Sequence, residues 1–304
     1  AIGEDVDNET LGGATTQTEI SGVVDYKCKD DADCLKKIRA IVDKLGTPKD
    51  AGFSREKAIA PKADQKELYG ILPAERTKPY DMRELIARLV DGSEFTEYKE
   101  GYGQSILTGY ARIDGWAVGI VANQRKVVKS KKGEMQFGGV IYSDSADKAT
   151  RFIANCNQKN IPLVFLQDVT GFMVGSRSEQ GGIIKDGAKM ANAVANSVVP
   201  KFTIIIGNSY GAGNYAMCGK AYDPRLIVGW PSAQVAVMGG EQASKVMLQI
   251  EVAALKGKGE TITPEKEAEL LNRIRSKYEE TISPYYAAAR LWLSAIIDPL
   301  ETRT

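Results

Sequence analysis

The stretches PLVFLQDVTGFMVG, residues 162–175, and KFTIIIGNSYGAGNYAM, residues 201–217, decide the fold of this chain. Each begins with a short apolar run rich in branched residues, which is typical of a strand buried on both faces. Each run then passes directly into a glycine-rich turn. A helical pattern over residues 182–196 lies between the two stretches, so the chain alternates strand, helix and strand. This alternation predicts an α/β domain.

The pattern continues on both sides of these stretches. Asp114-Gly115 suits a tight hairpin turn between strands over 105–113 and 116–122, and Asp81 can cap a helix over 82–89. Lys129 to Gly139 is expected to form a protruding loop or hairpin. The remaining predicted helices cover 31–44, 143–157, a segment opening at Gly240, 265–280 and 284–297. The remaining predicted strands cover 18–24, 225–229 and 234–238, and residues 208–213 are expected to be a loop.

Composition divides the chain into three parts. Residues 1–46 combine an acidic, turn-rich start with one amphipathic helix. Residues 47–78 are rich in Pro, Lys, Ala and Gly with weak periodicity, and we expect a linker there. Residues 79–304 carry the α/β pattern and form the main domain.

Composition also limits the chemistry. The 304 residues include 40 Lys and Arg against 39 Asp and Glu, so the formal charge of +1 gives no field that attracts nucleic acid or an anionic membrane. The chain has no histidine, which excludes Ser-His-Asp, Cys-His and H-E-x-x-H sites, and we predict no metal site. Catalysis must therefore use carboxylates, Lys, Tyr or backbone N–H groups.

The cysteine pattern and the length of the apolar runs indicate a reducing, intracellular setting. Cys28, Cys34, Cys156 and Cys218 include no C-x-x-C pair, and a chain of this length does not depend on disulfides to fold. The apolar runs are strand-sized, and the amino terminus lacks a basic region and an apolar signal core. We expect a cytoplasmic location, or the mitochondrial matrix in a eukaryote.

The two glycine-rich turns are the candidate site. In open α/β folds, ligands bind beyond the carboxyl ends of the strands. Glycines there let a ligand approach backbone amides, and the next helix adds partial positive charge. Such turns could form an oxyanion hole, or could simply allow tight turns and close packing. A third interpretation takes Gly211 to Ala216 as a dinucleotide fingerprint, but the following strand ends without the acidic residue that such a site uses.

The string from Tyr80 to Arg303 resembles the carboxyltransferase β subunits of biotin-dependent acyl-CoA carboxylases, and most of all their methylcrotonoyl-CoA branch. The resembling stretches are Tyr80 to Glu84, Asp91 to Phe95, Gly109 to Ile113, Gly119 to Asn123, Thr170 to Gly175, Gly211 to Tyr215 and Met238 to Ala243. Leu11 to Ala14 and Ser21 to Val23 look like the last part of the family's amino-terminal domain. Gln17 and Tyr26 stand where histidines would be expected, which leaves the acyl substrate open.

The resemblance implies a crotonase-like ββα spiral and a carboxyl-terminal, biotin-side domain over 79–304, with 1–46 as a remnant of the amino-terminal carboxyltransferase domain. The implied activity moves a carboxyl group from carboxybiotin to an acyl-CoA, of the methylcrotonoyl-CoA or propionyl-CoA kind, through enolates held by backbone amides. The implied cofactor is biotin on a carrier protein. The implied partners are biotin carboxylase, the biotin carboxyl carrier, the amino-terminal domain and further copies of the chain, as in a hexamer.

The resemblance also assigns the site residues by position. Gly171, Phe172, Ala212 and Gly213 would supply the catalytic amides, and Gly211 would shape the second turn. Biotin would contact Gly171, Phe172, Gly211, Ala212 and Tyr210. A biotin-linked acyl-CoA decarboxylase subunit and a crotonase-type enzyme without biotin are the alternatives, and a dinucleotide-binding domain is a more distant one.

Overall fold

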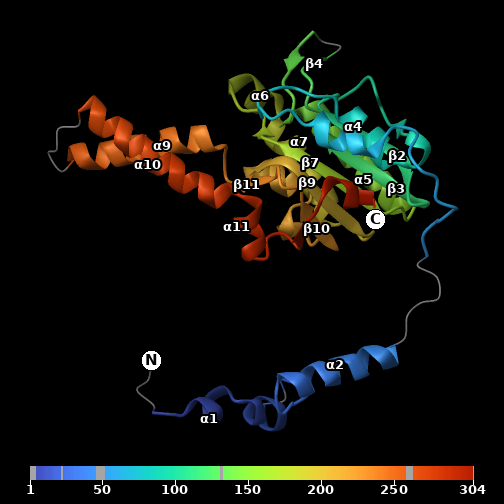
Figure 1. Ribbon diagram of the computed structural model, residues 1–304, viewed down its shortest axis with the longest axis vertical. Coiled ribbons are helices and arrows are strands. Elements are labelled where there is room, and N and C mark those ends of the chain that lie inside the picture. The colour runs from blue at the N-terminus through green and yellow to red at the C-terminus, as the bar shows by residue number, and fades with distance from the viewer. Residues whose placement is uncertain (1–4, 22, 46–51, 131–132, 258–262, 304) are drawn as a thin grey trace. The chain divides into compact units, whose positions relative to one another are not determined.

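The computed structural model describes residues 5–21, 23–45, 52–130, 133–257 and 263–303. The chain divides into two compact units, Ala1–Gly52 and Phe53–Thr304. The described residues of the smaller unit form α1 (Asn8–Gly12), a π-helical turn η1 (Thr16–Ile20) and α2 (Asp31–Leu45) (Figure 1). The helix predicted over 31–44 is confirmed.

The strand predicted over 18–24 is wrong, because the chain is helical at Thr16–Ile20. The Ser21 N–H donates to the Thr16 carbonyl at 2.9 Å, which is the spacing of a π-helix. The Thr18 hydroxyl donates to the Ala14 carbonyl at 2.5 Å. Such local bonds are interactions that hydropathy alone does not contain.

The described part of the expected linker is residues 52–78, of which 53–78 belong to the larger unit. Leu68 of α3 (Leu68–Ile71) is buried in its core, and the Arg55 guanidinium lies 4.9 Å from the centre of the Trp116 ring. Residues 47–51 lie outside the described residues. The assignment of 1–46 to an amino-terminal carboxyltransferase domain stays a prediction.

The larger unit contains an eight-stranded sheet with the order β1-β2-β3-β7-β9-β10-β12, and β11 pairs with the end of β9. These strands are β1 (Thr96–Glu97), β2 (Ile106–Ile113), β3 (Trp116–Asn123), β7 (Leu163–Val169), β9 (Lys201–Tyr210), β10 (Leu226–Gly229), β11 (Gln234–Ala236) and β12 (Ala295–Ile296). From β3 to β12 the neighbouring strands run parallel. The predicted α/β architecture is confirmed.

The hairpin of β2 and β3 forms as predicted. The strands pair antiparallel with Ile113 opposite Trp116, and Asp114 and Gly115 take φ values of +49° and +80°. Two positive φ values match the twist of the flanking strands, and aspartate and glycine are residues that tolerate them. The expected excursion is a second, smaller hairpin of β4 (Val128–Lys129) and β5 (Met135–Gln136), whose Lys131 and Lys132 lie outside the described residues.

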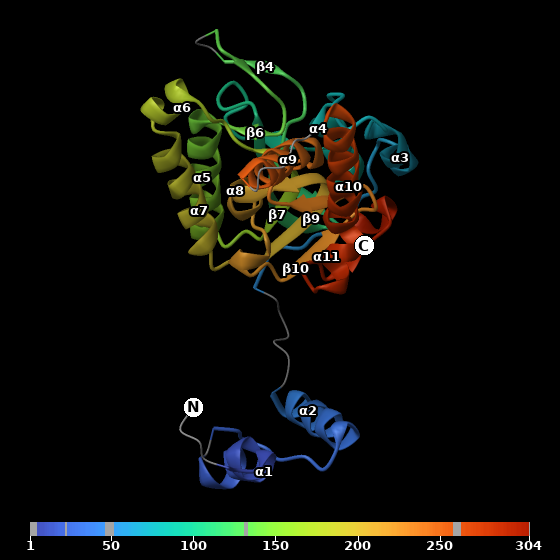
Figure 2. The same cartoon turned by 90° about the vertical axis from the view of Figure 1, so that its left-hand side faces the viewer.

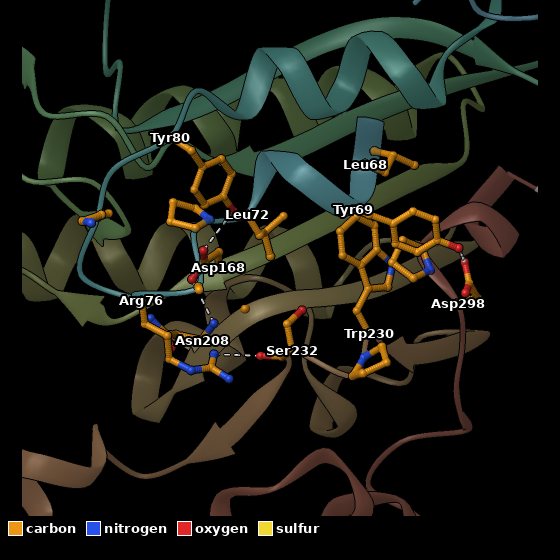
Figure 3. Close-up of a pocket in the computed structure, with 16 residues that line it drawn as sticks. Leu68, Tyr69, Leu72, Arg76, Tyr80, Asp168, Asn208, Trp230, Ser232 and Asp298 are labelled. Atoms are coloured by element: carbon orange, nitrogen blue, oxygen red, sulfur yellow. Dashed lines mark hydrogen bonds between the residues drawn. The ribbon is translucent and has the colours of Figure 1, made fainter. Parts of the chain in front are cut away.

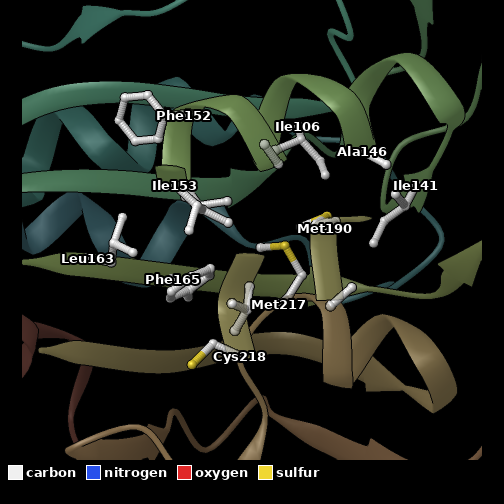
Figure 4. Close-up of a cluster of buried hydrophobic side chains, with 14 of the residues drawn as sticks. Ile106, Ile141, Ala146, Phe152, Ile153, Leu163, Phe165, Met190, Met217 and Cys218 are labelled. Atoms are coloured by element: carbon white, nitrogen blue, oxygen red, sulfur yellow. The ribbon is translucent and has the colours of Figure 1, made fainter. Parts of the chain in front are cut away.

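Helices cover both faces of the sheet. Figure 2 shows α5 (Ser143–Gln158) and α7 (Ile183–Ala195) side by side over one face, and Figure 4 shows the core beneath them. The helices α3 and α4 (Met82–Leu89) cover the other face. Along β7, Leu163 and Phe165 enter the first core, whereas Val164 and Leu166 enter the second. This alternation explains why the β7 sequence is a continuous apolar run.

The carboxyl-terminal helices α9 (Gly240–Gly257) and α10 (Pro264–Ile282) confirm the predictions and extend away from the sheet in Figure 1. They share a small core of their own, made by Leu248, Leu270 and Ile274. Among the described residues, no helix combines the length and the apolar character needed to cross a membrane.

The helix predicted over 284–297 is only partly right. α11 (Pro284–Ala289) ends early, because Leu291 takes a φ of +59° and the Trp292 N–H donates back to the Ala287 carbonyl at 2.9 Å. This is the usual geometry of a helix that ends with a left-handed residue. The chain then turns so that β12 can pair with β10.

Candidate functional site

The two glycine-rich bends follow neighbouring strands. β7 and β9 lie parallel, with Val169 opposite Ser209 at their carboxyl ends. β7 is followed by the short strand β8 (Gly171–Phe172), which pairs with β6 (Val140–Ile141). β9 continues through Tyr210, and α8 (Gly211–Ala216) begins at the next residue. The loop predicted over 208–213 is therefore wrong, because the strand passes into the helix without an intervening turn.

The bends touch at Gly213. A Cβ atom on Gly213 would lie 2.6 Å from Cγ2 of Val169 and 3.2 Å from the Cα of Gly171. Real Cβ atoms do not approach other atoms as closely as 2.6 Å, so only glycine allows the two backbones to come together here. The structure thus joins two segments that are about forty residues apart in the chain.

The other two glycines of the site have backbone angles that favour glycine. Gly171 has a φ of +139°, and Gly211 has a φ of +52° with its would-be Cβ 2.8 Å from the Val237 carbonyl oxygen. Gly211 therefore takes a positive φ at the point where β9 passes into α8.

The backbone amides at the bends differ in availability. The Thr170 N–H donates to the Gly139 carbonyl at 2.8 Å, so Thr170 cannot act as a donor to a ligand. Ala212 and Gly213 lie in the first turn of α8, where an α-helix leaves its N–H groups without an intrahelical acceptor, and Tyr210 provides no side-chain cap. The most available amides are thus at the start of α8.

An apolar groove of about 400 Å³ opens at the two bends. Its lining includes Phe172 from β8, Ile184 and Ala188 from α7, and Ala212 and Tyr215 from α8. The Phe172 ring lies over Gly187 of α7, whose would-be Cβ would be 2.7 Å from the ring. The structure therefore brings Phe172 and Ala212, two of the predicted site residues, onto the wall of one groove, which we call the glycine groove.

Tyr210 does not line the glycine groove. Its hydroxyl lies 2.5 Å from Gln234 Oε1 and 3.1 Å from Asn208 Oδ1, and it donates its one hydrogen between these two acceptors. Burial raises the pKa of Tyr210 to about 12. The predicted contact of Tyr210 with biotin has no support from this geometry, because the hydroxyl is buried and already bonded within the protein.

A second pocket of about 370 Å³ lies beside Asp168 and Asn208 (Figure 3). Asp168 is buried. Its Oδ2 accepts a hydrogen bond from the Tyr80 hydroxyl at 2.9 Å and lies 3.2 Å from Arg125 Nε, while its Oδ1 accepts from the Asn208 N–H at 2.8 Å. Burial, followed by the Asp168 charge, raises the pKa of Tyr80 well above its usual range. We call this the Asp168 pocket. The buried Asp168 carboxylate is paired with the Arg125 guanidinium.

Sequence reasoning missed a polar network that joins the bends. The Ser209 hydroxyl donates to Gln167 Oε1 at 2.6 Å and accepts from Asn214 Nδ2 at 2.7 Å, while Gln167 Nε2 donates to the Met217 carbonyl at 2.6 Å. Gln167 and Ser209 are fully buried. The available signal was a polar residue at the end of each buried strand, because a buried polar group requires a partner.

Comparisons with known proteins agree with this architecture. Residues 1–304 match the carboxyl transferase domain family. A biotin-dependent 3-methylcrotonyl-coenzyme A carboxylase beta subunit of Mycobacterium tuberculosis is 46% identical over 304 residues, which cover 100% of this chain and 55% of that protein. The mitochondrial methylcrotonoyl-CoA carboxylase beta chain of Dictyostelium discoideum is 45% identical over 303 residues, covering 100% of this chain and 49% of that protein.

A solved structure gives the same result. The transcarboxylase 12S structure, whose title describes a hexamer assembly and substrate binding to a multienzyme core, has a TM-score of 0.69 and 35% identity, covering 99% of this chain and 55% of that one. The crotonase-like fold expected from the resemblance is confirmed. The chain spans about half the length of the relatives it matches. By the match along its whole length and its identity to these relatives, the chain belongs to the carboxyl transferase domain family.

Proposed function

We propose that this chain is the biotin-side part of a biotin-dependent acyl-CoA carboxyltransferase. It takes part in moving a carboxyl group from carboxybiotin to an acyl-CoA of the methylcrotonoyl-CoA or propionyl-CoA kind. The observation that carries the proposal is the meeting of the two bends at Gly213, where an added Cβ atom would lie 3.2 Å from the Gly171 Cα, beside an apolar groove. No histidine is needed, because amides that stabilise a developing negative charge can supply most of the catalysis.

The glycine groove fits the chemistry of biotin, which has an apolar ring system and a polar ureido carbonyl. Phe172, Ile184 and Ala188 offer apolar surface for the rings. The amides of Ala212 and Gly213, with those of Gly171 and Phe172, are proposed to hold an oxygen that gains negative charge. Biotin, when bound, supplies the carboxyl group that is transferred, and the apolar wall keeps water away from it.

The partners are proposed on the same basis. A biotin carboxylase, a biotin carboxyl carrier and an amino-terminal carboxyltransferase domain complete the reaction, and the protein assembles as a homo-oligomer, with the hexamer as the proposed size. The support is the family match together with relatives named as biotin-dependent or as part of a hexamer. A cytoplasmic location, or the mitochondrial matrix in a eukaryote, is proposed with the partners, and the Dictyostelium discoideum relative is named as mitochondrial.

A carboxyl-transfer assay tests the proposal on the complete protein. Radioactive bicarbonate, ATP, the carboxylase partner and a panel of acyl-CoAs are mixed, and acid-stable label on each acyl-CoA is counted. We expect label on a branched or short acyl-CoA that depends on the biotinylated carrier and is abolished by avidin. Label that survives avidin would contradict the proposal.

The alternatives give different outcomes in the same set of assays. Turnover of an enoyl-CoA without biotin would indicate a crotonase-type enzyme, and loss of carboxyl without transfer to an acceptor would indicate a decarboxylase. An NAD fluorescence titration tests dinucleotide binding, and we expect no binding. The reason is that the strand after this segment, β10, ends at Gly229 without the acidic residue that a dinucleotide site uses.

A further inference from the structure

The buried network of Gln167, Ser209 and Asn214 has only one possible direction of hydrogen bonding. A backbone carbonyl can only accept, so the Gln167 amide must turn its Nε2 toward the Met217 carbonyl, 2.6 Å away. This leaves Gln167 Oε1 facing the Ser209 hydroxyl, which donates its one hydrogen to it at 2.6 Å. The Ser209 oxygen must then accept from Asn214 Nδ2 at 2.7 Å. The three side chains therefore hold one another in a single arrangement.

This network attaches α8 to the sheet at two points. Asn214 lies within α8 and bonds to Ser209 of β9, while Met217, the residue that ends α8, bonds to Gln167 of β7. A helix of six residues is too short to be stable without tertiary contacts. Gln167 and Ser209 are fully buried, so water does not replace a bond that is lost there. The position of α8 relative to β7 therefore depends on these bonds.

The pairing of β7 and β9 changes register at the place where the network lies. Gln167 pairs with Ile205, but Val169 pairs with Ser209, so the register shifts between Gln167 and Val169. Without the shift, Gly207 would lie opposite Val169. Irregularities of this kind redirect side chains and are common next to active sites. The shift brings Ser209 level with the last residue of β7, from which the first bend starts.

We propose that Gln167, Ser209 and Asn214 are positioning residues for carboxyl transfer, an inference that rests on the proposed function. They hold the second bend where its amides and those of the first bend face the same oxygen. None of the three lines the glycine groove, so they act through the backbone of α8 and not on the ligand. A displacement of about 1 Å in a reacting geometry can lower a rate roughly 100-fold. Loss of the network should therefore lower kcat and leave KM nearly unchanged.

Ser209→Ala, which removes the central hydroxyl, tests this proposal, with Thr203→Val as the matched control. Thr203 lies on the same strand, is also buried, and donates its hydroxyl to the Cys218 carbonyl at 2.7 Å, beyond the end of α8. Each variant thus loses one buried hydroxyl, and a similar loss of stability is expected.

The first measurement is carboxyl transfer by the complete protein with its biotinylated carrier. For Ser209→Ala we expect kcat to fall about tenfold to 100-fold, with KM for the carrier within about twofold of the wild-type value. For Thr203→Val we expect kcat and KM both to stay within about twofold. An equal fall in kcat for the two variants, or a rise in KM without a fall in kcat, would overturn the proposal.

Hydrogen–deuterium exchange of the same proteins, followed by mass spectrometry, gives a second measurement that does not depend on activity. The Met217 N–H bonds to the Gly213 carbonyl at 3.0 Å and exchanges only when α8 opens. We expect exchange in α8 to be roughly tenfold faster in Ser209→Ala and unchanged in Thr203→Val. That result in a wild-type protein that transfers no carboxyl group would refute the proposed function but support the anchoring of α8. Equal exchange in Ser209→Ala and the wild-type chain would overturn the positioning role.

Discussion

The glycine groove and the Asp168 pocket lie at the ends of the same two strands, β7 and β9, and are similar in size, yet their chemistry is opposite. The Asp168 pocket is lined by titratable side chains that include Asp168 and Tyr80. The Asp168 carboxylate already accepts hydrogen bonds from the Tyr80 hydroxyl and the Asn208 N–H and forms an ion pair with Arg125. The glycine groove has little charge but offers apolar surface and the first amides of a helix. The difference is one of availability: the first amides of α8 have no intrahelical acceptor, whereas the Asp168 carboxylate is already paired within the protein.

The largest expected effect comes from Asp168→Asn. The change leaves the buried Arg125 guanidinium without its counter-charge, so we expect the free energy of unfolding to fall by about 3 to 5 kcal/mol. Urea denaturation measures this loss. The control is Asp298→Asn in the same pocket, where the carboxylate is exposed and bonds Tyr69, and a loss below about 1 kcal/mol is expected. A large loss of carboxyl transfer by Asp168→Asn at unchanged stability would instead make Asp168 catalytic.

Gly213→Val should give the next largest effect, on activity. Its side chain would overlap Val169 and push α8 away from Gly171, so the amides at the two bends would no longer converge. We expect carboxyl transfer to fall roughly 100-fold to 1000-fold, the range seen when an oxyanion donor is lost. Gly70→Ala is the control, because a Cβ there meets no atom within 4 Å. Transfer at the wild-type rate by folded Gly213→Val would remove the glycine groove from the mechanism.

Lys148 is a buried charged residue that lines neither the glycine groove nor the Asp168 pocket. Its ammonium is fully buried, lies 3.8 Å from Glu97 Oε1 and has no hydrogen-bond partner among the described residues. Burial lowers the pKa of Lys148 to about 8. The unfolded chain keeps this proton up to a pH of about 10.5, so the unfolded state binds more protons between these values and stability rises with pH there.

The contribution of Lys148 to the free energy of unfolding is expected to rise by at most about 3 kcal/mol between pH 8 and pH 10.5. Lys148→Met should remove it, because the titrating group is gone. Urea denaturation at several pH values measures both chains, with the exposed Lys189→Met as the control that keeps the rise. A difference in stability between the wild-type chain and Lys148→Met that does not change over this range would show that Lys148 remains charged in the folded protein.

The smallest expected effect is that of Phe172→Ala. Removing the ring takes apolar surface from the wall of the glycine groove, and we expect the KM for the biotinylated carrier to rise about tenfold, equivalent to roughly 1.4 kcal/mol. Val174→Ala is the matched control, since Val174 lines the same groove but is 72% exposed. An equal rise in KM for the two variants would mean that Phe172 contributes no more to carrier binding than Val174 does.

Local patterns were sufficient for most elements of the fold. The β2–β3 hairpin, α4 with its Asp81 cap and the alternation from β7 to α8 follow from turn chemistry and hydrophobic period, which act between near neighbours. Errors occurred at 18–24 and 284–297, where hydrogen bonds to residues four or five positions back set the backbone. A third error occurred at 208–213, where pairing with β11 continues β9 as far as Tyr210. Hydropathy contains no information on such bonds.

By itself, the sequence determined the α/β class, the absence of histidine from the chain and the position of two glycine-rich stretches after buried strands. Only the tertiary structure decided that Gly213 meets Gly171, that Thr170 and Tyr210 are already bonded, and that Asp168 is paired with Arg125. The physical reason is that residue types and their local order are present in the unfolded chain, whereas these contacts join segments far apart in sequence and exist only once the sheet has formed.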